Sequence, residues 1–535
     1  MKLLIFTLGL MFLSIGAQAN EQKFNIILLT VDDMSADSIG AFGAPVKGTT
    51  PNIDKFAQDS FRFNYAHVHA TSCIPSRNAI SSGRYLYNSG VEGFYALPKE
   101  QVVFQTIPDV LRKQGYFTII RGKSKHSYPY HPYPAFDLNY DVILKETKEN
   151  IRKPESFYRY TKMGIKAAIK ARKPFFFSMD IHDPHTGYYN WDKKESRLGM
   201  NKDDLDNVPS KVFSVDEIVV PNFLPKTDLV KQELAAYYST VRRADDSFGQ
   251  VIKALKDTGV YDKTIFIFLS DHGMPEPFAK TANYYHSSRT PLIVRWPGVT
   301  KEGAIDKQHM IGTIDIFPSI LDMLGLDLIT GLDGRSFAPV LKGEKQEDRD
   351  YVYTMYEENV GGNRQPTRSI ISRDFAYICN LWSDGERKFS TATKGMAAYE
   401  EMSRLAKSDK FWKQRLNMLN FRVPEELYNY EKDPDALDNL ITKKEYETKL
   451  NELRGIMAEF MQKSRDPLLK LFENREDAKA ISAHLEKVTK ESEERRTQAI
   501  YSRSGKAKDD KKNKTEKDNS SKKDKSAKKA KKTPK

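Results

Sequence analysis

Short apolar runs recur along the first two thirds of the chain and predict buried β-strands. They are rich in Ile, Leu, Val and Phe, do not alternate strictly with polar residues, and cover Asn25–Val31, Phe117–Ile120, Pro174–Met179, Thr264–Leu269 and Leu292–Val294. Runs of this kind are typical of strands covered on both faces. Helical patterns alternate with them, at Asn52–Asp59, Ile107–Gln114, Leu229–Leu255 and Ile314–Leu324. This alternation predicts an α/β fold with a large, mostly parallel sheet between helices.

The pattern changes after about residue 344 and predicts a smaller C-terminal α+β subdomain. Strand-like runs at Tyr351–Glu357 and Asp374–Leu381 have no long helix between them. Charged helical stretches follow at Met396–Leu419, Lys443–Gln462 and Glu476–Glu494. We therefore expect a catalytic domain over residues 20–345, a C-terminal subdomain with helices over 346–500, and a tail over 501–535.

The first 19 residues have the pattern of a secretory signal peptide. One Lys precedes an apolar run from Leu3 to Ile15, and Ala17-Gln18-Ala19 supplies a small-x-small cleavage site. The run is shorter than the roughly 20 residues that span a bilayer. The order of these three features disfavours the alternative, a buried N-terminal strand. We expect a periplasmic or secreted protein without a transmembrane segment.

Most of the positive charge lies in the C-terminal tail. The whole chain has a formal net charge of +13, but residues 503–535 contain 15 Lys or Arg and 5 Asp or Glu, which leaves about +3 for the rest. The tail lacks aromatic residues and is predicted to be disordered. An alternative role is a loose electrostatic tether to anionic polysaccharide or a membrane surface. No motif indicates a nucleic-acid partner.

Charged and polar residues follow four of the predicted strands, where ligands bind in open α/β sheets. These strand ends read Asp32-Asp33, Arg121-Gly122-Lys123-Ser124-Lys125-His126, Asp180-Ile181-His182-Asp183-Pro184-His185 and Ser270-Asp271-His272-Gly273. Adjacent carboxylates repel, and their burial requires a cation. Asp32, Asp33, Asp271 and His272 therefore form a candidate divalent metal site. Oxygen ligands favour calcium or magnesium, and the imidazole leaves manganese or zinc open.

One of only two cysteines, Cys73, precedes a predicted helix over Ser76–Ser82. Helix N-termini attract anions, so Cys73 is either a thiolate nucleophile with a lowered pKa or a small residue packed at the helix start. A disulfide to Cys379 has no support, because Cys379 lies in an apolar strand-like run. Cationic candidates around an anionic substrate are Arg77, Lys123, Lys125, His126, His185 and Lys280.

The run Cys73-Ile74-Pro75-Ser76-Arg77, followed by Ser82-Gly83, resembles the signature of type I sulfatases, a family of the alkaline phosphatase superfamily. Further matches occur in family order from about Phe24 to Leu440, at Asn25–Asp33, Thr50–Asp54, Gly122-Lys123, Pro184-His185, Ser270–Gly273, Pro291–Val294 and Glu426–Tyr428. The resemblance implies an alkaline-phosphatase-like catalytic domain. It also implies that a separate maturation enzyme oxidises Cys73 to Cα-formylglycine.

By position, the resemblance also implies the role of each site residue. Residue 73, as the aldehyde hydrate, attacks sulfur. One divalent metal, expected to be calcium, is bound by Asp32, Asp33, Asp271, His272 and residue 73. Arg77 and Lys123 stabilise the hydrate, Lys280 neutralises sulfate charge, and His185 protonates the leaving group. One departure concerns Gly122–His126, where an extra residue separates Lys from His, so either His126 or Lys125 fills the family's histidine position.

The motifs His182–His185 and Ser270–Pro275, with Lys280 shortly after, look most similar to the sulfamidase branch, the heparan N-sulfatases. The expected substrate is therefore a sulfated glycan carrying sulfate esters or N-sulfate groups. Alternatives are a phosphonate or phosphodiester hydrolase of the same superfamily and an inactive glycan-binding relative. Tyr128, Tyr130, His131, Tyr133, Tyr188 and Tyr189 either stack on sugar rings or serve as packing and surface residues.

Overall fold

The structure is a computed structural model that describes residues 23–191, 206–359 and 361–497. The predicted signal peptide and the basic tail lie outside these residues. Among the helices in the described part of the chain, none combines the length and apolar character required to cross a bilayer.

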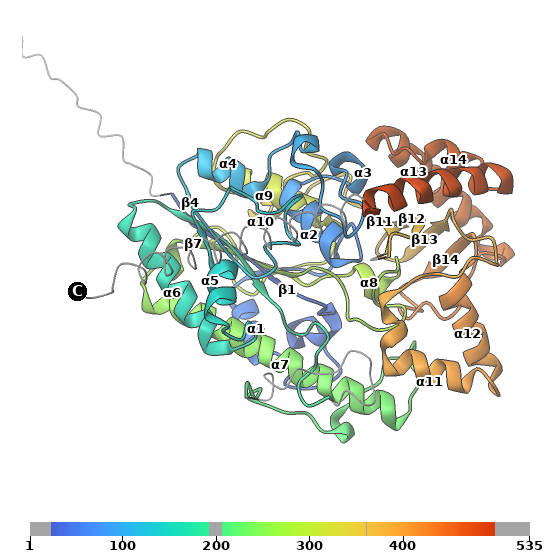
Figure 1. Ribbon diagram of the computed structural model, residues 1–535, viewed down its shortest axis with the longest axis horizontal. Helices are drawn as coiled ribbons and strands as arrows, with labels where there is room; N and C mark the ends of the chain where they lie inside the picture. The colour runs from blue at the N-terminus through green and yellow to red at the C-terminus, as the bar shows by residue number, and fades with distance from the viewer. Residues whose placement is uncertain (1–22, 192–205, 360, 498–535) are drawn as a thin grey trace, which may run out of the picture.

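A central eight-stranded sheet runs through the molecule (Figure 1). Its order is β5-β4-β6-β1-β7-β8-β2-β9. The strands are Leu138–Asn139 (β5), Phe117–Arg121 (β4), Phe175–Ile181 (β6), Asn25–Val31 (β1), Thr264–Ser270 (β7), Leu292–Arg295 (β8), Phe61–Phe63 (β2) and Ile305–Asp306 (β9). The five from β5 to β7 are parallel, while β8 is antiparallel to both of its neighbours. The predicted α/β fold with a large, mostly parallel sheet is confirmed.

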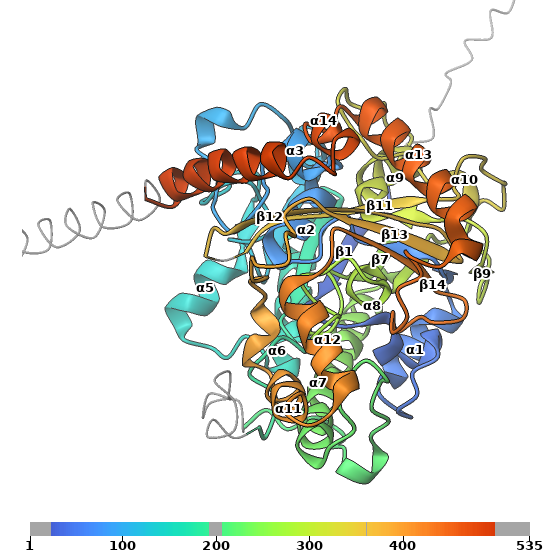
Figure 2. The same cartoon turned by 90° about the vertical axis from the view of Figure 1, so that its right-hand side faces the viewer.

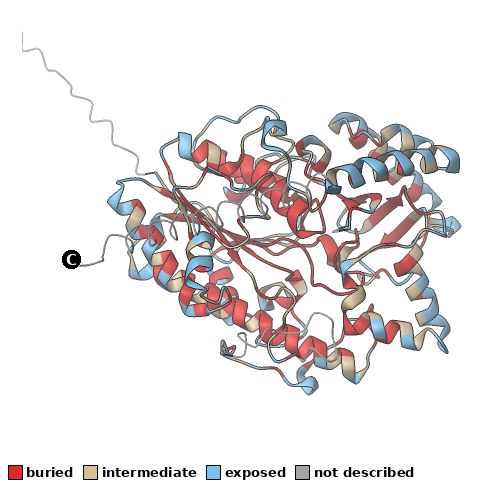
Figure 3. Cartoon of the chain, viewed as in Figure 1, coloured by how far each residue is buried: buried red, intermediate tan, exposed pale blue. Residues whose placement is uncertain are grey.

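Helices cover both faces of this sheet, as the unbroken apolar strands require. In β1, Ile27 and Leu29 face a core formed with Pro51–Gln58 (α1), Pro154–Lys170 (α6) and Asp228–Asp257 (α7). Ile26 and Leu28 face a second core with Ile107–Lys113 (α4), Ile316–Met323 (α9) and Ala338–Leu341 (α10). Figure 3 shows the sheet and the inner helix faces as buried. The strands are therefore held rigidly from both sides.

A second sheet lies at the other end of the molecule and is antiparallel throughout (Figure 2). It has the order β11-β12-β13-β14, with strands Val352–Glu358, Arg364–Ile371, Phe375–Asn380 and Glu425–Asn429. One face packs on Glu447–Ser464 (α13) and Leu469–Glu473 (α14). The other face packs on Ala397–Leu405 (α11) and Lys410–Phe421 (α12) and joins the core of the central sheet.

The single helical stretch predicted over Met396–Leu419 is wrong, since the structure breaks it into α11 and α12. The break lies at Asp409, whose side chain accepts hydrogen bonds from the backbone N–H groups of Phe411 and Trp412 and caps α12. Asp is a strong N-cap residue. The pair Ser408-Asp409 was therefore a local signal for the break.

Candidate active site

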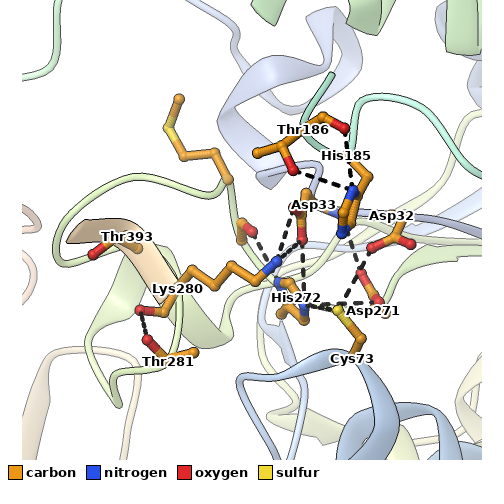
Figure 4. Close-up of polar contacts among 12 residues, drawn as sticks. Asp32, Asp33, Cys73, His185, Thr186, Asp271, His272, Lys280, Thr281 and Thr393 are labelled. Carbon is orange, nitrogen blue, oxygen red and sulfur yellow. Dashed lines mark hydrogen bonds and ion pairs between the residues drawn. The ribbon is translucent and has the colours of Figure 1, made fainter. Parts of the chain in front are cut away.

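The four predicted strand ends lie side by side, because β4, β6, β1 and β7 are consecutive parallel neighbours. Parallel strands bring their carboxyl ends to one edge of a sheet. Cys73 reaches the same edge from the first turn of the helix Cys73–Ser82 (α2). Figure 4 shows Asp32, Asp33, Asp271, His272, Lys280, His185 and Cys73 converging on one point.

Three carboxylates and one imidazole form a compact, fully buried donor cluster. Asp32, Asp271, His272 and Cys73 each place one ligand atom within 4.8 Å of the others. The His272 Nε2 atom lies 3.4 Å from Asp33 Oδ1 and 3.7 Å from Asp271 Oδ2. The other ring nitrogen, Nδ1, lies 3.0 Å from the Gly273 carbonyl oxygen, so Nδ1 carries the hydrogen and donates it to that oxygen. The lone pair of Nε2 then points into the cluster as a potential metal ligand.

This donor set fits a divalent cation. Asp271 Oδ2 is buried and lacks a hydrogen-bond donor among the described residues, although it forms an ion pair with Arg77. Burial and the neighbouring carboxylates raise the pKa of Asp271 in spite of Arg77. A bound cation would relieve this repulsion. Three carboxylates and one imidazole suit calcium, magnesium or manganese.

Cys73 is 4% exposed and lies at the centre of the cluster. Its Sγ atom is 3.3 Å from His272 Nε2 and 3.8 Å from Asp32 Oδ1. Burial, together with the surrounding carboxylates, raises the pKa of the Cys73 thiol in spite of Lys280. This direction is opposite to the lowered pKa expected for a thiolate nucleophile. Cys73 and Cys379 are both free and buried, so the structure contains no disulfide between them.

Three cations surround the carboxylates. Lys280 Nζ donates to Asp33 at 2.6 and 2.9 Å, and Lys123 forms an ion pair with Asp32. The Arg77 guanidinium lies 2.9 Å from Asp271 and 2.6 Å from Asp180. Burial opposes the charge of Lys280, but Asp33 and its neighbours raise its pKa overall. Lys280 therefore stays charged at neutral pH.

Two of the histidines predicted for the site border it. His185 is close enough to Asp32 and Asp33 to complete a second possible ligand group. Burial lowers the pKa of His185 to about 4 and that of His126 to about 3, so both imidazoles are neutral at pH 7. His126 Nδ1 is buried without a hydrogen-bond partner among the described residues, whereas Lys125 is exposed. The geometry thus favours His126 over Lys125 as the residue facing the site.

Two site residues, Asp180 and His182, received no role from the sequence. Asp180 belongs to β6, and both residues lie near Asp32. Burial raises the pKa of Asp180 to about 7, although Arg77 opposes this. The sequence feature that pointed to Asp180 and His182 was their position at the same strand end as His185. The sequence could not distinguish them from ordinary loop and strand residues.

The clustered tyrosines are mainly packing residues. Tyr128, Tyr133 and Tyr188 are buried, and the rings of Tyr128 and Tyr133 stack on each other with centroids 4.9 Å apart. Tyr130 and Tyr189 are only partly buried, and His131 is exposed. Among these six residues, only Tyr130, Tyr189 and His131 are exposed enough to stack on a sugar ring.

Comparisons with known proteins show which sequences this chain is similar to. A family model for sulfatases matches residues 24–326. A model for the C-terminal region of N-sulphoglucosamine sulphohydrolase matches residues 271–387. Human N-sulphoglucosamine sulphohydrolase is 27% identical over 465 residues, covering 83% of this chain and 91% of that protein. An ulvan-active sulfatase from Formosa agariphila is 25% identical over 461 residues, covering 82% and 75%.

Solved structures show the same fold at lower identity. The phosphonate monoester hydrolase of Agrobacterium radiobacter aligns with a TM-score of 0.59 and 18% identity, over 83% of this chain and 95% of that chain. The fold by itself is therefore compatible with more than one esterase chemistry.

Proposed function

This chain belongs to the sulfatase family, and we propose that it hydrolyses sulfate esters or N-sulfate groups of sulfated carbohydrates. The observation that carries the proposal is the convergence of Asp32, Asp33, Asp271 and His272 on Cys73, with Lys280 beside them. The predicted resemblance to the sulfamidase-like branch is confirmed by the C-terminal family match and the human relative. That relative is named for N-sulphoglucosamine, which supports an N-sulfated amino sugar as the first substrate to test.

Residue 73 is the nucleophile in this proposal, after a maturation enzyme has oxidised the cysteine to Cα-formylglycine. The raised pKa of the buried thiol supports this, because an unmodified thiol would remain protonated at neutral pH. One hydroxyl of the aldehyde hydrate attacks sulfur, and the second allows sulfate to be expelled. A serine or a thiol at this position has no second hydroxyl.

A divalent metal held by Asp32, Asp33, Asp271 and His272, with calcium the expected ion, would supply positive charge for the sulfate oxygens. Lys280 adds fixed positive charge beside Asp33, and Arg77 does so beside Asp271. Charges already in place at the reacting group cost no reorganisation during the reaction. Lys123, paired with Asp32, supports the hydroxyls of residue 73.

His185 is the candidate acid for the leaving oxygen or nitrogen. Its pKa of about 4 reflects burial before substrate arrives, in spite of Asp32 and Asp33. A bound sulfate brings negative charge next to the ring and raises the pKa of His185, which favours its protonated form. His126 borders the same site and is another imidazole available for proton transfer.

The test is sulfate release from defined substrates by protein purified from its native host. We expect release from N-sulfated or O-sulfated glucosamine and loss of turnover by more than about a thousandfold in the Cys73→Ser variant. Mass spectrometry of the peptide containing residue 73 should show the aldehyde in place of the thiol. An unmodified cysteine in an active sample would contradict the mechanism.

Aryl sulfate and aryl phosphodiester substrates separate the sulfatase from a phosphodiester hydrolase. We expect faster turnover of the sulfate. Faster turnover of the diester would reassign the chain within its superfamily. Removal of metal by a chelator should reduce the activity, and adding back calcium, magnesium and manganese separately should identify the ion.

A further inference from the structure

A basic groove lies on the C-terminal subdomain, next to a segment that contacts the residue after Lys280. It has a volume of about 480 Å³ and is lined by Lys394, Tyr399, Glu400, Ser403, Arg404 and Lys407. We call it the α11 groove, because five of its residues come from α11 and the turn that follows it. We propose that the α11 groove binds a second acidic group, a sulfate or a carboxylate, on a neighbouring unit of the sugar chain. The proposal rests on the proposed function.

The segment that carries Lys394 contacts the residue that follows Lys280. The hydroxyl of Thr281, which follows Lys280 in the chain, lies 2.5 Å from the hydroxyl of Thr391, and the hydroxyl of Thr391 lies 3.0 Å from that of Thr393. Lys394 comes next, in the short helix Ala392–Gly395 (η8). With a rise of about 2 Å per residue, Lys394 lies roughly 6 Å along the helix from Thr391. A sugar chain with one unit at Lys280 could therefore extend toward the groove.

One face of α11 forms the wall of the groove. Tyr399 and Ser403 are spaced four residues apart, as are Glu400 and Arg404, so these side chains project from the same side of the helix, and Lys407 lies in the turn that follows. The Tyr399 hydroxyl donates to Asn420 Oδ1 at 3.1 Å, which fixes the ring. A fixed aromatic ring beside cations and hydroxyls suits the alternating apolar and anionic surfaces of a sulfated sugar.

The wall is anchored to the catalytic core. The buried carboxylate of Glu233, on α7, accepts hydrogen bonds from the backbone N–H groups of Ala397 and Ala398 at 3.0 and 3.2 Å. These are the first two residues of α11. The groove is therefore held in a constant position relative to the strand ends.

The positive charge of the groove is incompletely neutralised. Three of its six lining residues are basic and one is acidic. Arg404 already pairs with Glu401, at 2.8 Å. Lys394 donates to the Phe389 carbonyl oxygen and has no carboxylate partner among the described residues. Its pKa is lowered by burial and by the neighbouring cations Lys388 and Arg422. An anion bound here would stabilise the charged form of Lys394.

The test compares a heparin-derived tetrasaccharide with N-sulfated glucosamine as a single unit. In the full-length Lys394→Gln/Lys407→Gln variant we expect the KM for the tetrasaccharide to rise roughly fivefold to twentyfold at low salt. The KM for the single unit and the kcat for both substrates should stay unchanged. The salt dependence of the tetrasaccharide KM should also become weaker.

A matched control removes two lysines elsewhere. Lys166 and Lys170 are exposed on α6, at the opposite end of the molecule from α11 in Figure 1. If the position of the lysines in the α11 groove matters, the Lys166→Gln/Lys170→Gln variant should have the same tetrasaccharide KM as the wild type. A Lys407→Glu variant repeats the test at an exposed side chain, in case Lys394 contributes to folding. Equal tetrasaccharide KM values in the groove variants and the wild type would overturn the proposal, as would an equal rise in the control.

A binding measurement separates this proposal from the proposed function. The tetrasaccharide is titrated calorimetrically into Cys73→Ala protein with and without the two groove substitutions. Weaker binding of the tetrasaccharide by the groove variant supports the α11 groove as a binding site. This conclusion holds even if the wild-type protein releases no sulfate, because that result would refute only the proposed function. Unchanged binding together with normal sulfate release from the single unit refutes only the groove.

Discussion

His185 shows how one side chain can be tested through the chemistry of the leaving group. A sugar hydroxyl or amine is a poor leaving group and needs a proton, whereas 4-nitrophenolate does not. We expect His185→Gln to lower kcat on a sugar sulfate by about a hundredfold to ten-thousandfold, the usual contribution of a general acid. The loss on 4-nitrophenyl sulfate should be less than about tenfold. Steady-state kinetics on both substrates provides the measurement.

The two substrates control for each other, because a variant that merely misfolds would lose both activities equally. Equal losses would therefore assign His185 a structural or metal-binding role. The matched change His126→Gln tests the second imidazole in the same assay. A larger leaving-group dependence in His126→Gln would transfer the acid role to that residue.

The turn after β4 places Lys123 at the site and requires glycine at its first position. Gly122 has a φ of 86°, and a Cβ atom there would lie 2.5 Å from the Asp180 carbonyl oxygen. The exposed Gly115 has a φ of 88° and nothing within 4 Å of such a Cβ. We expect Gly115→Ala to cost roughly 1–2 kcal/mol of unfolding free energy, from the left-handed backbone alone.

Gly122→Ala should cost at least about 1 kcal/mol more, because the backbone of β6 or the turn must shift. It should also lower turnover, since Lys123 moves away from Asp32. Urea denaturation of both variants measures the difference, and turnover of an aryl sulfate measures the displacement of Lys123. Equal stability of the two variants would show that the close approach to Asp180 is not restrictive.

At the scale of the whole molecule, His286 connects the catalytic core to the C-terminal subdomain. Its ring nitrogens each lie 2.9 Å from a carboxylate oxygen, of Asp37 on one side and Asp435 on the other. Burial alone would lower the pKa of His286, but the two hydrogen bonds raise it to about 9. The protonated imidazole therefore bridges the two segments at neutral pH.

The sign of the pH dependence follows from this raised pKa. The folded state holds the proton more tightly than the unfolded chain, so the stabilisation is complete below about pH 6.5 and is lost as the pH rises through about 9. We expect His286→Asn to reduce the unfolding free energy by on the order of 2 kcal/mol at pH 6 and by much less at pH 9.5. Urea denaturation at both pH values measures this change, and a pH-independent loss would rule out the charged bridge.

The amino-acid sequence determined the strands of the central sheet and the type of chemistry. The runs at Asn25–Val31 and Thr264–Leu269 are apolar because both faces of the sheet are covered, so burial alone identified β1 and β7. The sulfatase resemblance depended on short contiguous motifs, which need no folding to be read. By contrast, strand β12 was not predicted, because Arg364 and Arg368 break its apolar pattern. In the structure their charges are buried against Glu357 and Asp466.

Only the tertiary structure decided which charged residues meet. More than 100 residues of the chain separate Lys280 from Asp33, and the same holds for Arg77 and Asp180. No short sequence motif specifies either ion pair. The parallel order β4-β6-β1-β7 brings them to one edge. Similarly, the helical pattern near Tyr399 predicted a charged helix, but only the contact of its first residues with Glu233 fixed the position of α11 against α7. Local sequence sets burial and backbone preference, whereas long-range electrostatic contacts depend on the topology of the sheet.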